Sequence, residues 1–176
     1  MKKTIPILLF IISVSVSFGQ DAGKKVKWYT FQEAVKLSKE NPKKLFIDVY
    51  TDWCSWCKKM DKETFEYPEI AKILNSEYYP VKFNAESKEP IGFGGKTFIN
   101  EGSRSRNPHQ LAVALLQGQM SYPSVAYMTE DLQLLTAVPG YLTPEQIEPI
   151  LLFFANDYYK TEKWEEFQAS FESRIK

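Results

Sequence analysis

Apolar residues along the chain follow two different patterns, and each pattern predicts a different kind of element. Apolar side chains that recur every three to four positions predict amphipathic helices, whereas short apolar runs between breakers predict buried strands. Helices are expected at 31–40, at 54–65, from 68, from 108, at 143–158 and at 162–174. Strands are expected at 45–50, 79–83, 124–128 and 132–138.

Helix boundaries are marked by capping and breaking residues. The segments Thr30–Glu33 and Thr143–Gln146 both have the spacing of a capping box, in which two side chains satisfy unpaired backbone N–H groups of the first turn. Pro42 ends the first helix, because the residue before a proline disfavours helical geometry. Pro149 falls inside the helix that follows Thr143, and it should kink that helix or delay its start.

The order of these elements predicts the fold class. Thr129–Asp131 is so short a connection that the last two strands should form an antiparallel hairpin. Strands joined by helices and followed by a hairpin predict a three-layer α/β fold, with a central mixed sheet and helices on both faces. Residues 85–107 are rich in glycine and charge, and we expect them to form an ordered insertion or a long loop before the helix at Pro108.

The first 20 residues have the order of a secretory signal peptide. Lys2 and Lys3 precede an apolar run from Ile5 to Phe18, after which small residues follow. This run is shorter than the roughly 20 apolar residues of a spanning helix, and serines interrupt it. We therefore expect residues 1–20 to be removed and residues 21–176 to form one exported domain without a membrane span; an uncleaved anchor is the alternative.

Composition narrows the range of partners. Without residues 1–20 the chain has 20 basic and 22 acidic residues, a balance that indicates neither nucleic acid nor an acidic membrane surface as a partner. The chain is 44% hydrophobic and long enough to bury a core, so its two cysteines are not needed as a structural framework.

The two cysteines, Cys54 and Cys57, lie three positions apart where a helix is expected to begin. A helix N-terminus favours negative charge, so Cys54 should be the nucleophilic thiolate, partly exposed, and Cys57 the buried resolving thiol. Such a pair exchanges disulfides through a mixed disulfide, and the dithiol itself carries the electrons. No bound cofactor is therefore expected.

Asp48 is the single charge in an otherwise apolar strand. A lone carboxylate is costly to bury, so the position needs an explanation. Burial would raise its pKa and make it a usable proton acceptor near neutral pH. A solvated or internally hydrogen-bonded aspartate is the alternative.

The chain resembles the thioredoxin superfamily, and within it the exported thioredoxin-like proteins with an Asp-x-x-x-x-Trp-Cys-x-x-Cys-Lys pattern. Here that pattern occupies Asp48–Lys58. The resemblance covers most of residues 28–155 and extends to Lys82–Asn84, Tyr122–Ser124 and Gly140. Each match is weak alone, but their order and strand context together are specific.

The resemblance implies roles for further residues. Lys82 would pair with Asp48, which would handle the proton of Cys57. The Tyr122–Pro123 bond would be cis, with Pro123 against the cysteines and the Tyr122 backbone free to pair with an extended substrate. Two tryptophans complete the set of expected substrate-binding residues: Trp53, expected chiefly to pack beside the site, and Trp56, an exposed contact. Ser55-Trp56 replaces the Gly-Pro of the best-known reductants, which leaves the direction of electron flow open.

His109 is the only histidine of the chain. A catalytic Cys–His pair is conceivable, but the Cys-x-x-Cys motif accounts for both cysteines, so a surface or capping histidine is expected. Two cysteines and one histidine do not supply the four ligands of a closed zinc site. No metal site is therefore expected.

Together these features predict an exported thiol-disulfide oxidoreductase that acts on disulfides of exported proteins and exchanges electrons with an unidentified donor or acceptor. The periplasm is its expected location, and secretion is the alternative. A second hypothesis is a redox-inactive thioredoxin-fold binding module. In that case the Cys54–Cys57 disulfide would be permanent and the insertion would recognise a partner.

Overall fold

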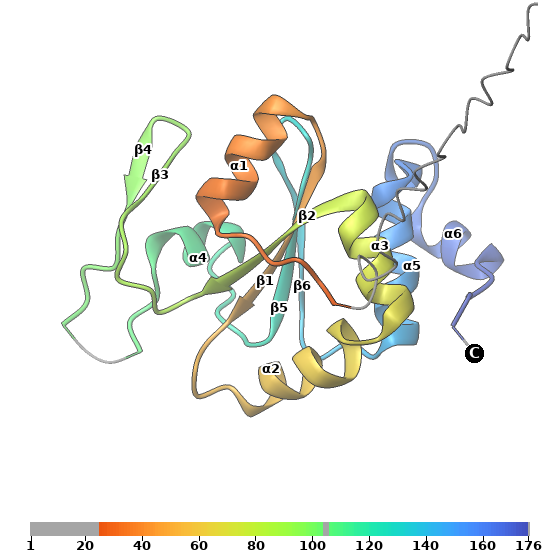
Figure 1. Ribbon diagram of the computed structural model, residues 1–176, viewed down its shortest axis with the longest axis horizontal. Helices are drawn as coiled ribbons and strands as arrows, with labels where there is room; N and C mark the ends of the chain where they lie inside the picture. The colour runs from red at the N-terminus through yellow and green to blue at the C-terminus, as the bar shows by residue number, and fades with distance from the viewer. Residues whose placement is uncertain (1–24, 104–105, 176) are drawn as a thin grey trace, which may run out of the picture.

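A four-stranded mixed sheet forms the centre of the computed structural model, which describes residues 25–103 and 106–175 (Figure 1). The strands lie in the order β2-β1-β5-β6, with bounds β1 Lys44–Tyr50, β2 Tyr78–Asn84, β5 Ser124–Met128 and β6 Leu134–Pro139. β1 runs parallel to β2, whereas the β1–β5 and β5–β6 pairs are antiparallel. The predicted α/β fold with a mixed sheet is confirmed; the predicted signal peptide at 1–20 lies outside the described residues.

Helices cover both faces of this sheet and make it a three-layer fold (Figure 1). α1 (Phe31–Glu40) and α4 (Gln110–Leu115) pack on one face. α2 (Ser55–Met60), α3 (Pro68–Glu77) and α5 (Pro144–Ala155) pack on the other. The sheet is therefore buried on both sides, which explains why nearly all residues of its central strand β1 are apolar.

Side chains of β1 alternate between two hydrophobic clusters. Leu45, Ile47 and Val49 join the cluster beneath α1 and α4, and Phe46 joins the cluster beneath α3 and α5. All four are fully buried. The period-2 geometry of a strand imposes this alternation, and it also decides which face receives Asp48.

Both predicted capping boxes form. The Thr30 hydroxyl accepts a hydrogen bond from the Glu33 backbone N–H, and the Glu33 carboxylate accepts one from the Thr30 N–H. The same reciprocal pair links Thr143 and Gln146. Pro149 lies inside α5 without delaying its start.

α5 is shorter than predicted. The helix ends at Ala155, and Asp157 adopts the left-handed conformation (φ 60°) before a 3₁₀ turn at Tyr158–Lys160. The expected helix to residue 158 is therefore wrong in its last turn. Asp157, just beyond the end of the helix, forms an ion pair with Lys44 of β1, which also pairs with Glu130.

The hairpin is confirmed, but β6 begins two residues later than predicted. Leu132 has φ 62°, a left-handed conformation that cannot continue a strand. The turn is closed by hydrogen bonds from Thr129 N–H to the Gln133 carbonyl and from Leu132 N–H to the Thr129 carbonyl, both 2.9 Å. The connection thus covers residues 129–133.

The helix expected at 54–65 changes its geometry partway. α2 ends at Met60 and a π-helix, η1 (Asp61–Phe65), continues it, with Glu66 N–H bonding the Asp61 carbonyl. π-helical segments widen the turn and often occur at functional sites. The prediction was right about the extent of this helix and wrong about its type.

The described part of the insertion at 85–107 contains a short β-hairpin. Its hairpin pairs β3 (Ile91–Phe93) with β4 (Lys96–Phe98) and projects from the body of the fold (Figure 1). Gly94 and Gly95 form the turn with positive φ values of 59° and 74°, the conformation that two-residue hairpin turns require.

The C-terminal segment packs over α5. α6 (Trp164–Ser170) is shorter than the predicted 162–174, because Phe171 adopts an extended conformation and residues 171–175 form no helix. The buried Glu148 carboxylate holds this segment by accepting hydrogen bonds from the Ser173 hydroxyl and the Arg174 N–H.

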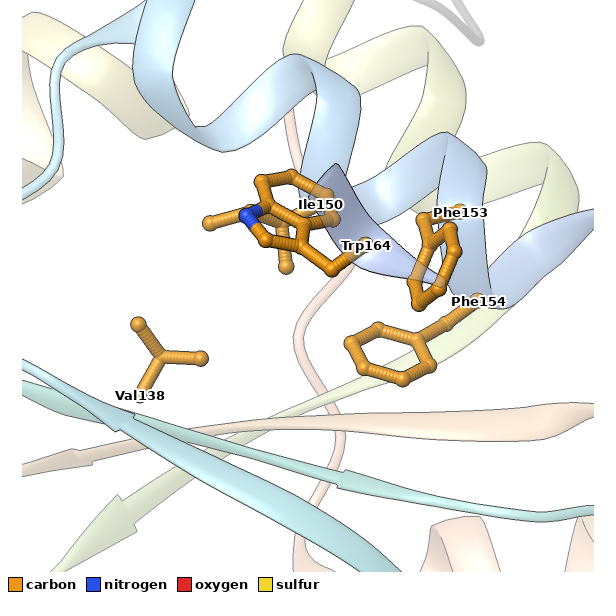
Figure 2. A pocket seen from close by; sticks show the side chains of 5 residues that line it. All are labelled: Val138, Ile150, Phe153, Phe154 and Trp164. Carbon is orange, nitrogen blue, oxygen red and sulfur yellow. The ribbon is translucent and has the colours of Figure 1, made fainter. Parts of the chain in front are cut away.

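Beside the edge strand β6, α5 and α6 leave an apolar cavity of about 270 Å³ (Figure 2). Val138 forms its floor, and its other lining side chains, all from the two helices, are Ile150, Phe153, Phe154 and Trp164. The cavity offers space to apolar groups and almost no polar partner.

Candidate redox site

The two cysteines form a disulfide at the start of α2, immediately after the loop that follows β1. Cys54 is the N-cap residue, and its sulfur accepts a hydrogen bond from the Cys57 N–H at 3.0 Å. The Cys54 N–H in turn donates to the Thr51 carbonyl at 3.1 Å. The Cys54 sulfur therefore occupies the place where a helix N-terminus stabilises negative charge.

Both cysteines are buried in this oxidised state. Cys54 is 4% exposed and Cys57 is 2% exposed, so the expected partial exposure of Cys54 is wrong. Trp53 and Trp56, adjacent in sequence to the cysteines, are by contrast exposed, at 49% and 54%.

Asp48 lies on β1, 1% exposed, and its Oδ2 accepts a hydrogen bond from Lys82 Nζ. The two residues are register partners of the parallel β1–β2 pair, which places their side chains on the same face. The expected pairing is thus confirmed. No hydrogen-bond partner reaches the other carboxylate oxygen, Oδ1, among the described residues.

Asp61 is a third member of this cluster, which the sequence analysis missed. Its carboxylate pairs with the same Lys82 ammonium, while its side chain remains 41% exposed. Asp61 follows Cys57 by four positions, so it lies one helical turn further along the α2–η1 segment. That spacing was the available signal, but a charged residue on an amphipathic helix ordinarily faces solvent.

Three aromatic rings surround the Lys82 ammonium. Its Nζ lies 4.9 Å from the ring centroid of Tyr50, 5.2 Å from that of Trp28 and 5.5 Å from that of Phe65. The faces of aromatic rings attract cations, so the rings and the two carboxylates together stabilise a charged lysine. A cavity of about 340 Å³ adjoins the cluster, and Trp28, Phe65, Asp61 and Lys82 contribute to its lining.

Burial and charge shift the pKa values of this cluster in defined directions. Desolvation raises the pKa of Asp48 to about 6, although the Lys82 ammonium acts in the opposite direction. Burial acts to lower the pKa of Lys82, but the attraction of Asp48 and Asp61 outweighs it and the pKa is raised. Asp48 therefore changes charge close to neutral pH while Lys82 stays protonated.

The Tyr122–Pro123 peptide bond is cis, as the resemblance implied. Among the described residues nothing hydrogen-bonds the Tyr122 backbone N–H or carbonyl. The Pro123 carbonyl accepts a hydrogen bond from Gly140 N–H at 2.8 Å, which ties the start of β5 to the residue after β6.

Each tryptophan of the cysteine loop packs against a tyrosine from the end of the hairpin. The Trp53 and Tyr122 ring centroids are 6.0 Å apart, and those of Trp56 and Tyr141 are 5.4 Å apart. Because Tyr122 precedes Pro123 and Tyr141 follows Gly140, the two pairs connect the cysteine loop to both strands of the hairpin. Of the four expected substrate-binding residues, Trp53, Trp56 and Tyr122 take part in these pairs, whereas Pro123 is buried.

His109 is the N-cap of α4, as expected for a capping histidine, but it is fully buried rather than on the surface. Its Nδ1 accepts a hydrogen bond from Leu111 N–H, so its Nε2 carries the proton and donates to the Glu89 carbonyl, both at 3.0 Å. Burial lowers its pKa. His109 therefore serves to fasten the insertion to α4.

Within residues 25–103 and 106–175 no group of three or more His, Cys, Asp or Glu residues is arranged to hold a metal ion. The same residues contain no helix with the length and apolar character needed to cross a bilayer.

Comparison with known proteins agrees with this geometry. Residues 10–173 match the family model Thioredox_DsbH, whose description is "Protein of unknown function, DUF255". The thioredoxin-fold protein of Helicobacter pylori superimposes with a TM-score of 0.56 at 15% identity, over 73% of this chain and 82% of that one. This likeness shows a shared fold.

Two curated proteins are similar in sequence to parts of the chain. An uncharacterized Caenorhabditis elegans protein is 29% identical over 135 residues, which cover 76% of this chain and 16% of that protein. The thiol:disulfide interchange protein DsbD of Vibrio vulnificus is 40% identical over 43 residues, which cover 24% of this chain and 7% of that protein. The chain thus spans only a small part of the length of these relatives.

Proposed function

Because the chain belongs to the Thioredox_DsbH family of thioredoxin-like proteins, we propose that it is a thiol-disulfide oxidoreductase whose working group is the Cys54–Cys57 pair. One observation carries the proposal: the Cys54 sulfur lies at a helix N-terminus and accepts a hydrogen bond from the Cys57 N–H. That position stabilises a thiolate, and the thiolate is the reactive form in disulfide exchange. The similarity to part of a thiol:disulfide interchange protein supports the same reaction class.

The proposed reaction begins with the reduced protein. The Cys54 thiolate attacks one sulfur of a substrate disulfide, the substrate S–S bond breaks, and the other substrate sulfur leaves as a thiolate that takes up a proton. Cys57, once deprotonated, attacks the Cys54 sulfur of the mixed disulfide and releases the second substrate thiol. The substrate gains two electrons, and the protein is left with its Cys54–Cys57 disulfide.

In this proposal Asp48 accepts the Cys57 proton. Its pKa of about 6 makes the carboxylate available at neutral pH while keeping it basic enough to take a proton. Lys82 holds the carboxylate in place by its hydrogen bond. Asp61 shares the Lys82 ammonium and so moderates the stabilisation that Asp48 receives.

The substrate surface in this proposal comprises the unpaired Tyr122 backbone and the exposed rings of Trp53 and Trp56, with the buried cis-Pro123 directly after Tyr122 in the chain. An extended substrate segment would pair with the Tyr122 N–H and carbonyl, which are free within the described chain. The two tryptophans, one on each side of Cys54 in the sequence, offer flat and exposed apolar surface.

The sequence pattern of residues 1–20 supports an exported protein, and we propose that its substrates are disulfides of other exported proteins, in the periplasm. A separate reductant or oxidant must then restore the cysteines after each turnover, because one dithiol carries only two electrons.

A measured reduction potential tests the function most directly. Equilibration of the purified domain with glutathione buffers, read by thiol alkylation and mass, should give a single two-electron transition, and the domain should reduce a disulfide-bonded protein when a dithiol is supplied. The matched control is Cys54→Ala, which should abolish turnover. A Cys54–Cys57 disulfide that resists reduction would favour the binding-module hypothesis instead.

A further inference from the structure

The two ends of the insertion meet at Trp53. Glu86, just after β2, accepts a hydrogen bond from the Trp53 indole N–H at 2.9 Å. Arg106, at the other end, places its guanidinium carbon 4.9 Å from the centroid of a Trp53 ring. Trp53 is thus held by residues twenty positions apart in the insertion as well as by its contact with Tyr122.

A side-chain amide holds these two ends together. Asn100 Nδ2 donates to the Glu86 carbonyl at 3.2 Å and to the Asn107 carbonyl at 2.7 Å, so it links Glu86 to the residue that follows Arg106. His109 adds backbone and side-chain bonds to Ala85 and Glu89. The insertion is therefore anchored to the fold at both ends and directed toward the redox loop.

Arg106 has unused hydrogen-bonding capacity. It is exposed, and it forms no ion pair or hydrogen bond with any described residue. Within the described chain it makes a cation–π contact with the Trp53 ring. Glu86, which also contacts Trp53, accepts the Trp53 N–H through Oε1 and forms no ion pair with Arg106 among the described residues. A guanidinium presents planar donors that match a carboxylate, and stacking on a ring fixes its plane.

From these contacts we infer that the insertion selects substrates: Glu86 and Arg106 fix Trp53 as one wall of the substrate surface, and Arg106 binds an acidic side chain next to the substrate disulfide. The inference rests on the proposed function and adds a substrate class to it. Trp53 adjoins Cys54 directly in sequence, so a carboxylate bound there would lie close to the bond that is exchanged.

Matched peptides test this preference. Three disulfide-bonded peptides would differ only in the residue beside one cysteine, which is Glu, Gln or Lys. The protein should exchange the Glu peptide fastest and the Lys peptide slowest, with kcat/KM for Glu about two- to five-fold above Gln, the range of a partly exposed ion pair. The preference should weaken as ionic strength rises.

Three variants distinguish recognition of the substrate charge by Arg106 from a nonspecific effect of changing a charge in the insertion. Arg106→Gln should remove the preference for Glu over Gln, and Arg106→Glu should invert the order of the Glu and Lys peptides. The matched control is Lys96→Gln, which removes one positive charge from the exposed β4 strand of the same insertion and should retain the order. Retention of the order by Arg106→Gln would overturn the inference.

Glu86 is a positioning residue in this inference, and a conservative variant tests it. Glu86→Ala should lower kcat/KM for the Glu peptide by about two- to five-fold, the scale of one lost hydrogen bond, and Glu86→Gln should restore most of it because an amide oxygen still accepts from Trp53. Equal losses in Glu86→Ala and Glu86→Gln would contradict the positioning role.

An uncharged substrate distinguishes failure of the inference from failure of the proposed function. Wild-type protein should exchange bis(2-hydroxyethyl) disulfide, which has no charge for Arg106 to bind. No exchange with this compound or with any peptide would overturn the oxidoreductase proposal and the inference together. Exchange with it, combined with equal rates for the three peptides, would overturn the inference alone.

Discussion

Lys82 donates a hydrogen bond to the buried carboxylate of Asp48, and the two residues are direct partners in the parallel pairing of β1 and β2. The ammonium does not fully compensate for burial, because the pKa of Asp48 is raised to about 6 rather than lowered. Asp48 is therefore costly to ionise even beside Lys82, and it lies on β1, the strand that precedes the cysteine loop.

The first prediction is that Asp48→Asn stabilises the protein at pH 7.5 and slows exchange. A pKa raised from 3.8 to about 6 means that ionised Asp48 destabilises the fold by at most about 3 kcal/mol above pH 6. Since the folded state binds the extra proton between these two values, the wild type gains stability as pH falls through that window, and the advantage of the variant should vanish below pH 4. Urea unfolding at pH 7.5 and pH 4 measures this.

The kinetic half of that prediction has its own readout. Loss of a proton acceptor should slow exchange at neutral pH on the order of 100-fold. Unchanged turnover in a folded Asp48→Asn protein would make Asp48 a structural residue only.

The second prediction concerns Asp61. Its negative charge raises the pKa of Asp48 and competes for Lys82, so Asp61→Asn should lower the pKa of Asp48. The exchange rate of this variant should then reach half of its maximum at a lower pH than that of the wild type. Asp131→Asn, which also removes one acidic charge but lies in the β5–β6 turn, is the control and should leave the midpoint in place. Identical midpoints in Asp61→Asn and wild type would exclude the proposed moderating role.

The third prediction concerns the asymmetry of the cysteines. After reduction, Cys54 should be alkylated faster than Cys57, because only Cys54 is placed at the N-cap of α2. Cys57→Ala should accumulate a mixed disulfide with substrate through Cys54, which non-reducing electrophoresis detects. Cys54→Ala should trap none; equal and slow alkylation of both reduced thiols would contradict the assignment of the nucleophile.

The fourth prediction concerns His109. Burial lowers its pKa, so the unfolded chain binds the proton more readily, and the contribution of His109 to stability should fall as pH drops below about 6.5, opposite in sign to that of Asp48. Protonation would also give Nδ1 a hydrogen that conflicts with the Leu111 N–H it now accepts from. His109→Asn keeps an N-cap acceptor without titrating, and should remove this loss on the acid side.

His109→Ala should be less stable than His109→Asn. It loses both the cap and the bond to the Glu89 carbonyl, at a cost of about 2–4 kcal/mol. Unfolding curves over pH 5–8 for wild type and both variants provide the measurement. An acid-side loss that persists in His109→Asn would place its origin elsewhere.

Local rules were enough to predict the kind and order of the elements. The capping boxes at Thr30 and Thr143 and the Cys-x-x-Cys motif at a helix start each depend on residues within one helical turn, and the structure has all three. Element ends were less predictable, because Leu132 and Asp157 adopt left-handed conformations that ordinary side chains do not signal.

The sequence by itself thus determined the fold class, the redox motif and, through family resemblance, the Asp48–Lys82 pair and the cis bond at Pro123. Only the tertiary structure decided that β5 lies antiparallel beside β1, that Asp61 reaches Lys82 and that Glu86 and Arg106 meet at Trp53. These contacts join residues about 20 to 80 positions apart, where periodicity and propensity carry no information about pairing. The burial of both cysteines has the same origin, since it depends on how the cysteine loop packs against the rest of the fold.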